Sequence, residues 1–193
     1  MNFEERVLRT LTDIQSMIIL LANAGNIPIK GRTWLQKEMF LLAERIEKIR
    51  EDASYEPDLM GPYSDVLEEE LTQLENLGII SIDDNKISIT SSGKQIAKIL
   101  EKKESAEVLQ YIKDYKEFLN DLSQDELLCF VYSSRPDMTK ESVKYEKLKP
   151  KMEKVLLNLV IKEKISKSRA AELLNKDLEY ILDKLKGKQK ILS

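Results

Sequence analysis

Hydrophobic residues recur at helical spacing through the first fifty positions of the chain. One stripe predicts a helix over about residues 3–23, and it consists of Val7, Leu11, Ile14, Ile18 and Leu21. A second stripe predicts a helix over about residues 32–51, and it consists of Leu35, Met39, Leu42 and Ile46. We expect Trp34 to pack between these two helices rather than to stack on a ligand, and residues 52–60 to form a loop.

The next segment combines a third helix with a pair of strands. Leucines at 67, 71 and 74 predict a helix that opens at Pro62 or Ser64 and is capped by left-handed backbone at Gly78. Alternating isoleucines then flank residues 83–86, a turn rich in Asp and Asn, which is typical of a β-hairpin. Thr90 to Ser92 are good N-caps for another helix.

Beyond residue 105 the pattern is helical throughout. Ser123 and Glu126 have the spacing of a capping box, and Pro150 is placed to open a later helix. The mostly polar residues 137–149 are the best candidate for a linker. The chain therefore divides into four expected parts: 1–104, 105–136, 137–149 and 150–193.

The last part has the signals of a helix-turn-helix. Ser166 is a good N-cap, Ala170 and Ala171 allow two helices to cross closely, and Asn175 suits a left-handed turn. Asp177 can cap the second helix, whose inward residues are expected to be Leu178, Ile181, Leu182 and Leu185. The predicted fold is thus mainly α-helical: a winged helix of three helices and a two-stranded wing, a helical extension packed on it, and a C-terminal helix-turn-helix.

Composition restricts the chemistry. The 193 residues include no histidine, which removes the commonest general base and metal ligand, and a single cysteine, Cys129, which excludes an internal disulfide. We expect no enzyme, no catalytic residue, no metal and no cofactor; carboxylate chemistry through Asp58, Asp83 or Asp84 is the remaining enzymatic alternative. The longest apolar run is far shorter than a membrane helix needs, and the acidic start MNFEER is unlike a signal peptide. A cytoplasmic protein that does not contact membranes is expected.

Charge is distributed unevenly. Residues 1–135 contain 16 Lys and Arg against 25 Asp and Glu, whereas residues 136–193 contain 15 against 9, so the two parts carry −9 and +6. Basic residues neutralise nucleic-acid phosphates. The expected DNA-binding residues are Lys162, Lys164, Lys167, Ser168, Arg169, Lys176, Tyr180, Lys184, Lys186 and Lys188. Secondary candidates are Lys30, Arg32, Lys37, Lys86, Lys94, Lys98, Lys102 and Lys103.

The third helix has the opposite charge. It contains acids and no Lys or Arg, so it would repel phosphate at the position where a winged helix commonly reads DNA. We therefore expect it to bind protein instead, through Asp65, Glu68, Glu69 and Glu70.

Short motifs in residues 5–142 resemble the microbial winged-helix family related to the Panacea antitoxin domain. Four of them stand in the family's order: Leu35-Gln36-Lys37, Gly61-Pro62-Tyr63-Ser64, Leu77-Gly78-Ile79-Ile80 and Ile89-Thr90-Ser91-Ser92-Gly93. Three more resemble the helical extension of archaeal members: Asp125-Glu126-Leu127-Leu128, Val131-Tyr132 and Pro136. This resemblance implies the fold far more than an activity.

Residues 155–186 are similar to a small prokaryotic antitoxin-like family. The shared core is Ile165-Ser166 followed by Ala170-Ala171-Glu172-Leu173, with Lys176 at a place where the pattern prefers an apolar residue. Two functions stay open. One is a homodimeric DNA-binding transcription regulator or antitoxin-like protein with a toxin partner, and the other is a protein-interaction module, neutralising a toxin or acting as a scaffold, that does not bind DNA.

Overall fold

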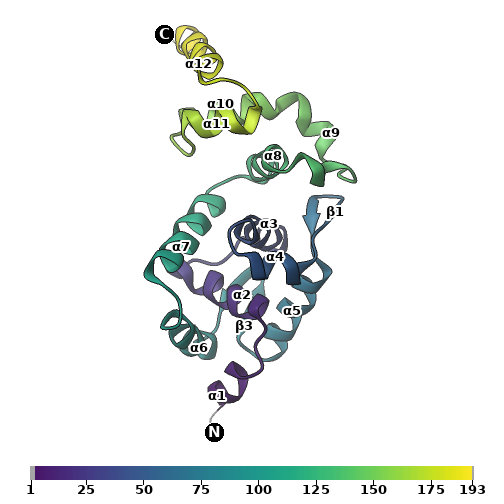
Figure 1. The fold of residues 1–193 in the computed structure, drawn as a ribbon, viewed down its shortest axis with the longest axis vertical. Helices are drawn as coiled ribbons and strands as arrows, with labels where there is room; N and C mark the ends of the chain where they lie inside the picture. Colours follow the sequence, from purple (N-terminus) through teal and green to yellow (C-terminus); the bar gives the residue numbers. More distant parts are fainter. Residues whose placement is uncertain (1–2, 193) are drawn as a thin grey trace. The chain divides into compact units, whose positions relative to one another are not determined.

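The structure is a computed structural model that describes residues 3–192, with the side chains of all of these except Lys48 and residues 188–192. The protein is mainly helical, with a small wing-like sheet of two strands. It forms two compact units (Figure 1). The N-terminal unit comprises Met1–Glu56 and Pro62–Asp121, and the C-terminal unit comprises Pro57–Gly61 and Leu122–Ser193.

The unit boundary divides the segment 105–136, which was expected to form one extension. Helix α7 (Ala106–Asn120) belongs to the N-terminal unit, because Ile112 joins that unit's hydrophobic core. Helix α8 (Gln124–Ser134) belongs to the C-terminal unit, where Leu128 and Tyr132 are core residues. The expected linker 137–149 contains short helical turns, among them η2 (Pro136–Thr139) and α9 (Tyr145–Leu148).

Helix α2 (Asp13–Asn23) is central to the N-terminal unit, because residues on all its sides are buried. It does not continue from α1 (Phe3–Leu8), so the prediction of one helix over 3–23 was wrong. Thr12 and Gln15 form a capping box, in which each side chain accepts the other's backbone N–H, at 3.1 and 3.2 Å. This box begins a new helix although the hydrophobic stripe continues across it.

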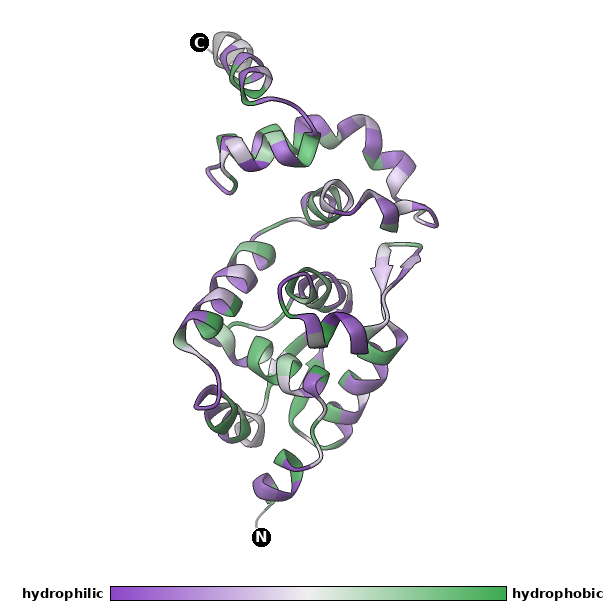
Figure 2. Ribbon diagram, in the orientation of Figure 1, coloured by the Kyte–Doolittle hydropathy of each residue, from purple (hydrophilic) through white to green (hydrophobic). Residues whose placement is uncertain are grey.

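The predicted helix over 32–51 is also two helices, α3 (Arg32–Ala43) and α4 (Glu47–Ala53). Ile46 adopts an extended conformation between them, and this turns the chain so that Ile49 and Ala53 enter the core. Long hydrophobic stretches in α2, α3 and α8 are green in Figure 2. Trp34 packs on the core as expected, but it lies against α7, where its indole N–H donates to the Leu119 carbonyl at 3.2 Å.

The third helix, α5 (Asp65–Asn76), begins at Ser64, which is its N-cap, as predicted. Strands β3 (Ile80–Asp83) and β4 (Lys86–Ile89) then form the predicted hairpin, with Ile80 opposite Ile89. Asp84 and Asn85 both have positive φ, as a two-residue hairpin turn requires. Ile29 adds an antiparallel bridge to Ile87, with backbone hydrogen bonds of 2.9 and 3.0 Å.

Thr90 is the N-cap of α6 (Ser91–Glu101). Helix α7 contacts the end of α2 and the chain beyond it through a buried lysine, Lys116. The Lys116 side chain has no exposed surface, and its Nζ donates to the carbonyls of Ala22, Ala24 and Ile27 at 3.1, 2.9 and 2.6 Å. An ammonium group has three N–H donors, so these three carbonyls satisfy it completely. Burial lowers the pKa of Lys116 to about 8, against the opposing attraction of Glu38 and Glu117.

The N-terminal unit also contains a buried acid, Glu38. It has no exposed surface, and among the described residues neither of its carboxylate oxygens has a hydrogen-bond partner. Burial raises the pKa of Glu38 from 4.5 to about 8, and the positive charges of Lys116 and Lys30 oppose this only in part. Glu38 therefore holds a proton at neutral pH.

The C-terminal unit incorporates a hairpin tip from between α4 and α5. Strands β1 (Glu56–Asp58) and β2 (Gly61–Tyr63) form this hairpin, whose residues 57–61 belong to the unit. The Leu59 carbonyl accepts hydrogen bonds from the Ser142 hydroxyl and the Val143 N–H, both at 3.1 Å. Gly61 has a φ of +84°, and a Cβ there would lie 2.7 Å from Cε1 of Tyr132. Only glycine permits this approach.

The longer helices of the C-terminal unit are α8, α10 (Met152–Ile161), α11 (Lys167–Leu174) and α12 (Leu178–Leu192). Ser123 and Glu126 form the predicted capping box of α8. Pro150 lies in the short turn η3 (Lys149–Lys151), immediately before α10. Leu157, Val160, Ala170, Ala171 and Ile181 form a core among α10, α11 and α12.

We predict that the free energy of unfolding falls as the pH rises from about 5 to about 8, and that Glu38→Gln removes this fall. A raised pKa stabilises the folded state fully below the unfolded pKa of 4.5, and this contribution is lost as the pH rises through about 8. The expected loss is on the order of 1–3 kcal/mol. Urea unfolding at pH 5, 6.5 and 8 measures it. The exposed Glu104, changed to Gln, is the control and should keep the wild-type profile; equal slopes for wild type and Glu38→Gln would refute the assignment.

Candidate nucleic-acid interface

Helices α11 and α12 are joined by a short turn in the segment for which the sequence predicts a helix-turn-helix. The Ser166 hydroxyl accepts from the Arg169 N–H at 3.0 Å and begins α11, which ends at Asn175 in left-handed backbone with φ 50° and ψ 49°. The Asp177 carboxylate then accepts from the Tyr180 N–H at 2.7 Å and begins α12. All three local signals, the two caps and the turn, are confirmed.

One inward residue was predicted wrongly. Leu178 is 45% exposed, whereas Ile181 is buried and Leu182 and Leu185 are half-buried. Leu178 is the first residue of α12, and the core against this helix is formed with Ile181 and Leu185 in its later turns. An exposed leucine therefore stands beside the turn.

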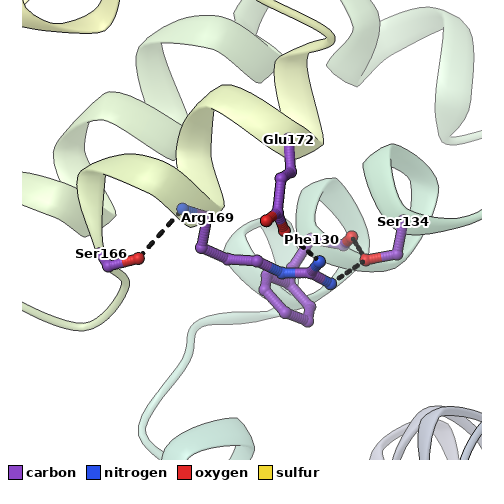
Figure 3. A network of polar contacts seen from close by, with 5 residues as sticks. All are labelled: Phe130, Ser134, Ser166, Arg169 and Glu172. Carbon is purple, nitrogen blue, oxygen red and sulfur yellow. Dashed lines mark hydrogen bonds and ion pairs between the residues drawn. The ribbon is translucent and has the colours of Figure 1, made fainter. Parts of the chain in front are cut away.

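Arg169 connects α11 to α8 (Figure 3). Its guanidinium pairs with Glu172 at 2.9 Å, donates to the Ser134 hydroxyl at 3.5 Å, and lies 5.6 Å from the centre of the Phe130 ring. Ser134 in turn donates to the Phe130 carbonyl at 2.9 Å. Arg169, which was predicted to bind DNA, thus forms part of the contact between α11 and α8.

Other predicted cations also have acidic partners within the C-terminal unit. Lys162 pairs with Glu126 at 2.7 Å, and Lys186 pairs with Asp183 at 3.6 Å. Partial burial would raise the pKa of Glu126, but the hydrogen bonds from Lys162 and Ser123 outweigh it and lower the pKa to about 2. Lys164 is half-buried and also has a partner.

Tyr180 and Lys184 share one carboxylate. The Tyr180 hydroxyl donates to Glu153 of α10 at 3.0 Å, and the Lys184 Nζ lies 3.5 Å from the other oxygen of the same group. Lys184 and Lys176 lie 5.2 and 5.6 Å from the centre of the Tyr180 ring. These contacts bring Lys176, Tyr180 and Lys184 together on α12 and the turn before it.

Three predicted residues remain exposed at the two ends of α11. Lys167 and Ser168 lie in its first turn, and Lys176 lies in the turn that follows it. Among the described side chains, neither Lys167 nor Lys176 is in an ion pair. An eight-residue helix is about 12 Å long, so these lysines bracket a segment of that length. Lys188 lies outside the residues whose side chains are described.

The two units differ in charge in the same direction as the two parts of the sequence, but by less. The C-terminal unit contains 16 Lys and Arg and 12 Asp and Glu, a net charge of +4, which leaves −7 on the N-terminal unit. Glu179 and Asp183 are nevertheless exposed on α12. They reduce the attraction of this helix for phosphate.

The acidic α5 has fewer unpaired acids than its sequence indicates. Glu68 forms an ion pair with Arg32 of α3, and Glu70 accepts from the Gln15 amide of α2 at 2.6 Å. Asp65 and Glu69 remain exposed. The secondary candidate Lys37 is buried and donates to the Pro62 carbonyl at 2.7 Å, so it is not a surface cation.

The acids that hold the basic residues were not identified from the sequence. Glu126 is 36 residues from Lys162, and Glu153 is 27 residues from Tyr180, so no local pattern relates them. Two other pairs, Arg169 with Glu172 and Lys186 with Asp183, have a recognisable helical spacing, i and i+3.

Within residues 3–192, no helix has the length and apolarity that crossing a membrane requires. The Cys, Asp and Glu side chains described there form no group of three or more that could hold a metal ion.

Comparisons of the chain with protein-family models, with curated proteins and with solved structures gave no match.

We predict that Arg169→Ala lowers the free energy of unfolding by about 1–2 kcal/mol, because it removes a contact between α11 and α8. Lys167→Ala, two residues away and exposed, should change it by less than about 0.5 kcal/mol. Denaturant unfolding followed by circular dichroism measures both. Equal stability of the two variants would show that the Arg169 contacts do not hold α11.

Proposed function

We propose that this protein is a DNA-binding regulator that contacts double-stranded DNA through α11, the following turn and α12. The observation that carries the proposal is the pair of lysines, Lys167 and Lys176, that stand exposed at the two ends of α11 in a capped helix-turn-helix. In such motifs the second helix enters the major groove while flanking residues contact phosphates. Ser168 and the exposed first turn of α11 offer further phosphate contacts.

The N-terminal unit supports the same class of protein. Its elements follow the order helix, bridge, helix, helix and two strands, represented by α2, Ile29, α3, α5 and the hairpin β3–β4. We infer a winged helix from this order and from the pairing of Ile29 with Ile87, with α4 and the hairpin β1–β2 inserted before α5. The acidic α5 does not enter a groove in this proposal, so DNA contact belongs to the C-terminal unit.

The proposal extends to assembly and cellular role. A homodimer would present two copies of α12 to a two-fold symmetric site, as other helix-turn-helix proteins do. The family resemblances favour an antitoxin-like regulator with a toxin partner in the cytoplasm, and they add no catalytic function.

Lys167→Ala and Lys176→Ala are expected to weaken binding to duplex DNA of any sequence. Each change removes one phosphate contact, so the slope of log affinity against log salt concentration should become shallower by about 1 per lysine. Fluorescence anisotropy over a salt titration measures the slope.

Arg6→Ala/Arg9→Ala is the matched control, because it removes the same charge from exposed positions of the N-terminal unit that are not binding candidates. It should leave the slope unchanged. An affinity that does not change with ionic strength, or a control variant whose slope falls as much as that of the lysine variants, would overturn the assignment of the interface.

A second candidate function is protein binding through α5. Asp65 and Glu69 favour it, since they are exposed one helical turn apart, and Leu77 near the end of the helix is 44% exposed. A partner with a basic surface would suit this face, because α5 contains no Lys or Arg.

Asp65→Lys/Glu69→Lys should abolish binding of such a partner and leave DNA affinity unchanged or raised. Glu68→Lys would not test this surface cleanly, because Glu68 pairs with Arg32 inside the unit. Pull-down and DNA titration with the same variant separate the two functions. A variant that keeps its protein partners would exclude α5 as the binding surface.

A further inference from the structure

Glu153 of α10 contacts two of the residues of α12 that were predicted to bind DNA. It is in the first turn of α10, and its two carboxylate oxygens are contacted by Tyr180 and Lys184 of α12 at 3.0 and 3.5 Å. Lys176 lies beside the same tyrosine ring. A single carboxylate therefore interacts with two side chains that were predicted to bind DNA.

The contact is open to solvent. The Glu153 side chain is 41% exposed and the Lys184 side chain is 48% exposed. Exposed ion pairs contribute little net stability, about 0–1 kcal/mol, because water and salt compete with each partner. Replacing Glu153 by another anion at Lys184 therefore costs the protein little.

The donors suit a phosphate as well as they suit a carboxylate. A phenol O–H and an ammonium group both donate to anionic oxygens, and these charge-assisted bonds are the stronger kind. The interactions with Tyr180, followed by those with Glu153, raise the pKa of Lys184, so this residue stays cationic. Tyr180 and Lys184 are one helical turn apart on α12, which lets both reach one anionic group.

We propose that Glu153 is an internal competitor of nucleic acid: its carboxylate occupies the place that a backbone phosphate takes when Tyr180 and Lys184 contact DNA. The inference rests on the proposed DNA-binding function and assigns a regulating residue to that same site. Affinity is then set by an exchange, in which Lys184 leaves Glu153 and binds phosphate. The pair lowers affinity for DNA of every sequence alike, because phosphate contacts do not distinguish bases.

Glu153→Gln tests the exchange. The amide can still accept from Tyr180, so the contact between α10 and α12 is retained, while the charge that holds Lys184 is lost. Affinity for duplex DNA should rise about threefold or more, and the salt slope should steepen by about 1, because one more lysine reaches phosphate. Thermal unfolding checks that the fold is kept.

A double-mutant cycle separates this mechanism from a general effect of charge. In a Lys184→Gln background, the gain from Glu153→Gln should vanish, because no lysine is left to release. Glu179→Gln, an equal charge change at an exposed site on α12, should have the same effect in both backgrounds. Glu153→Asp keeps the charge but shortens the side chain, and it should raise affinity in the same direction.

The possible outcomes are distinct. A gain that persists without Lys184, or no gain in Glu153→Gln and Glu153→Asp, overturns the competition while the losses in Lys167→Ala and Lys176→Ala still support DNA binding. No binding by wild type or by any variant overturns the proposed function, and the competition with it. Binding that appears only in Glu153→Gln and Glu153→Asp supports the competition and shows that the wild-type interface is closed by this residue.

Discussion

The N-terminal unit depends on how one ammonium group is satisfied without water. Lys116 donates to the carbonyls of Ala22, Ala24 and Ile27, which belong to the segment where the central helix α2 ends. A buried charge is costly unless it is fully hydrogen-bonded, so the end of α2 and the chain beyond it are fixed by α7. That chain leads directly to Ile29, which pairs with the wing strand. Glu38, protonated nearby, avoids adding an unpaired anion to this core.

The C-terminal unit uses its charged groups in a different way. Most of its ion pairs are exposed, and they hold cations that would otherwise be available to an anionic partner, as Glu126 does for Lys162 and Glu153 does for Lys184. These pairs leave the net charge of the unit unchanged, but they reduce the number of cations that are free to contact an anionic partner. Lys167 and Lys176 are among the cations that pair with no acid in the described part of the chain, and the capped helix α11 sets their positions at its two ends.

Local chemistry in the sequence was sufficient for the caps and turns, and insufficient for the contacts between distant residues. Ser123, Ser166 and the turn at 84–85 were predictable because each depends on neighbours within a few positions. The helix breaks at Thr12 and Ile46 were missed because the hydrophobic stripe runs on past both. Other interactions join residues that are far apart in the chain, so sequence periodicity does not predict them. Examples are the interactions of Glu38 and Lys116, and those of Arg169 with α8.

The close approach of Gly61 to Tyr132 has a consequence for how this protein can be altered by recombination. Residues 57–61 complete the C-terminal unit although they are encoded between two helices of the other one. A gene segment beginning at Leu122 would leave Tyr132 and Ser142 facing an empty place where the backbone of this small loop belongs. Recombination that transfers only the coding sequence of the basic helices would therefore give an incomplete unit. A complete unit requires both stretches of coding sequence.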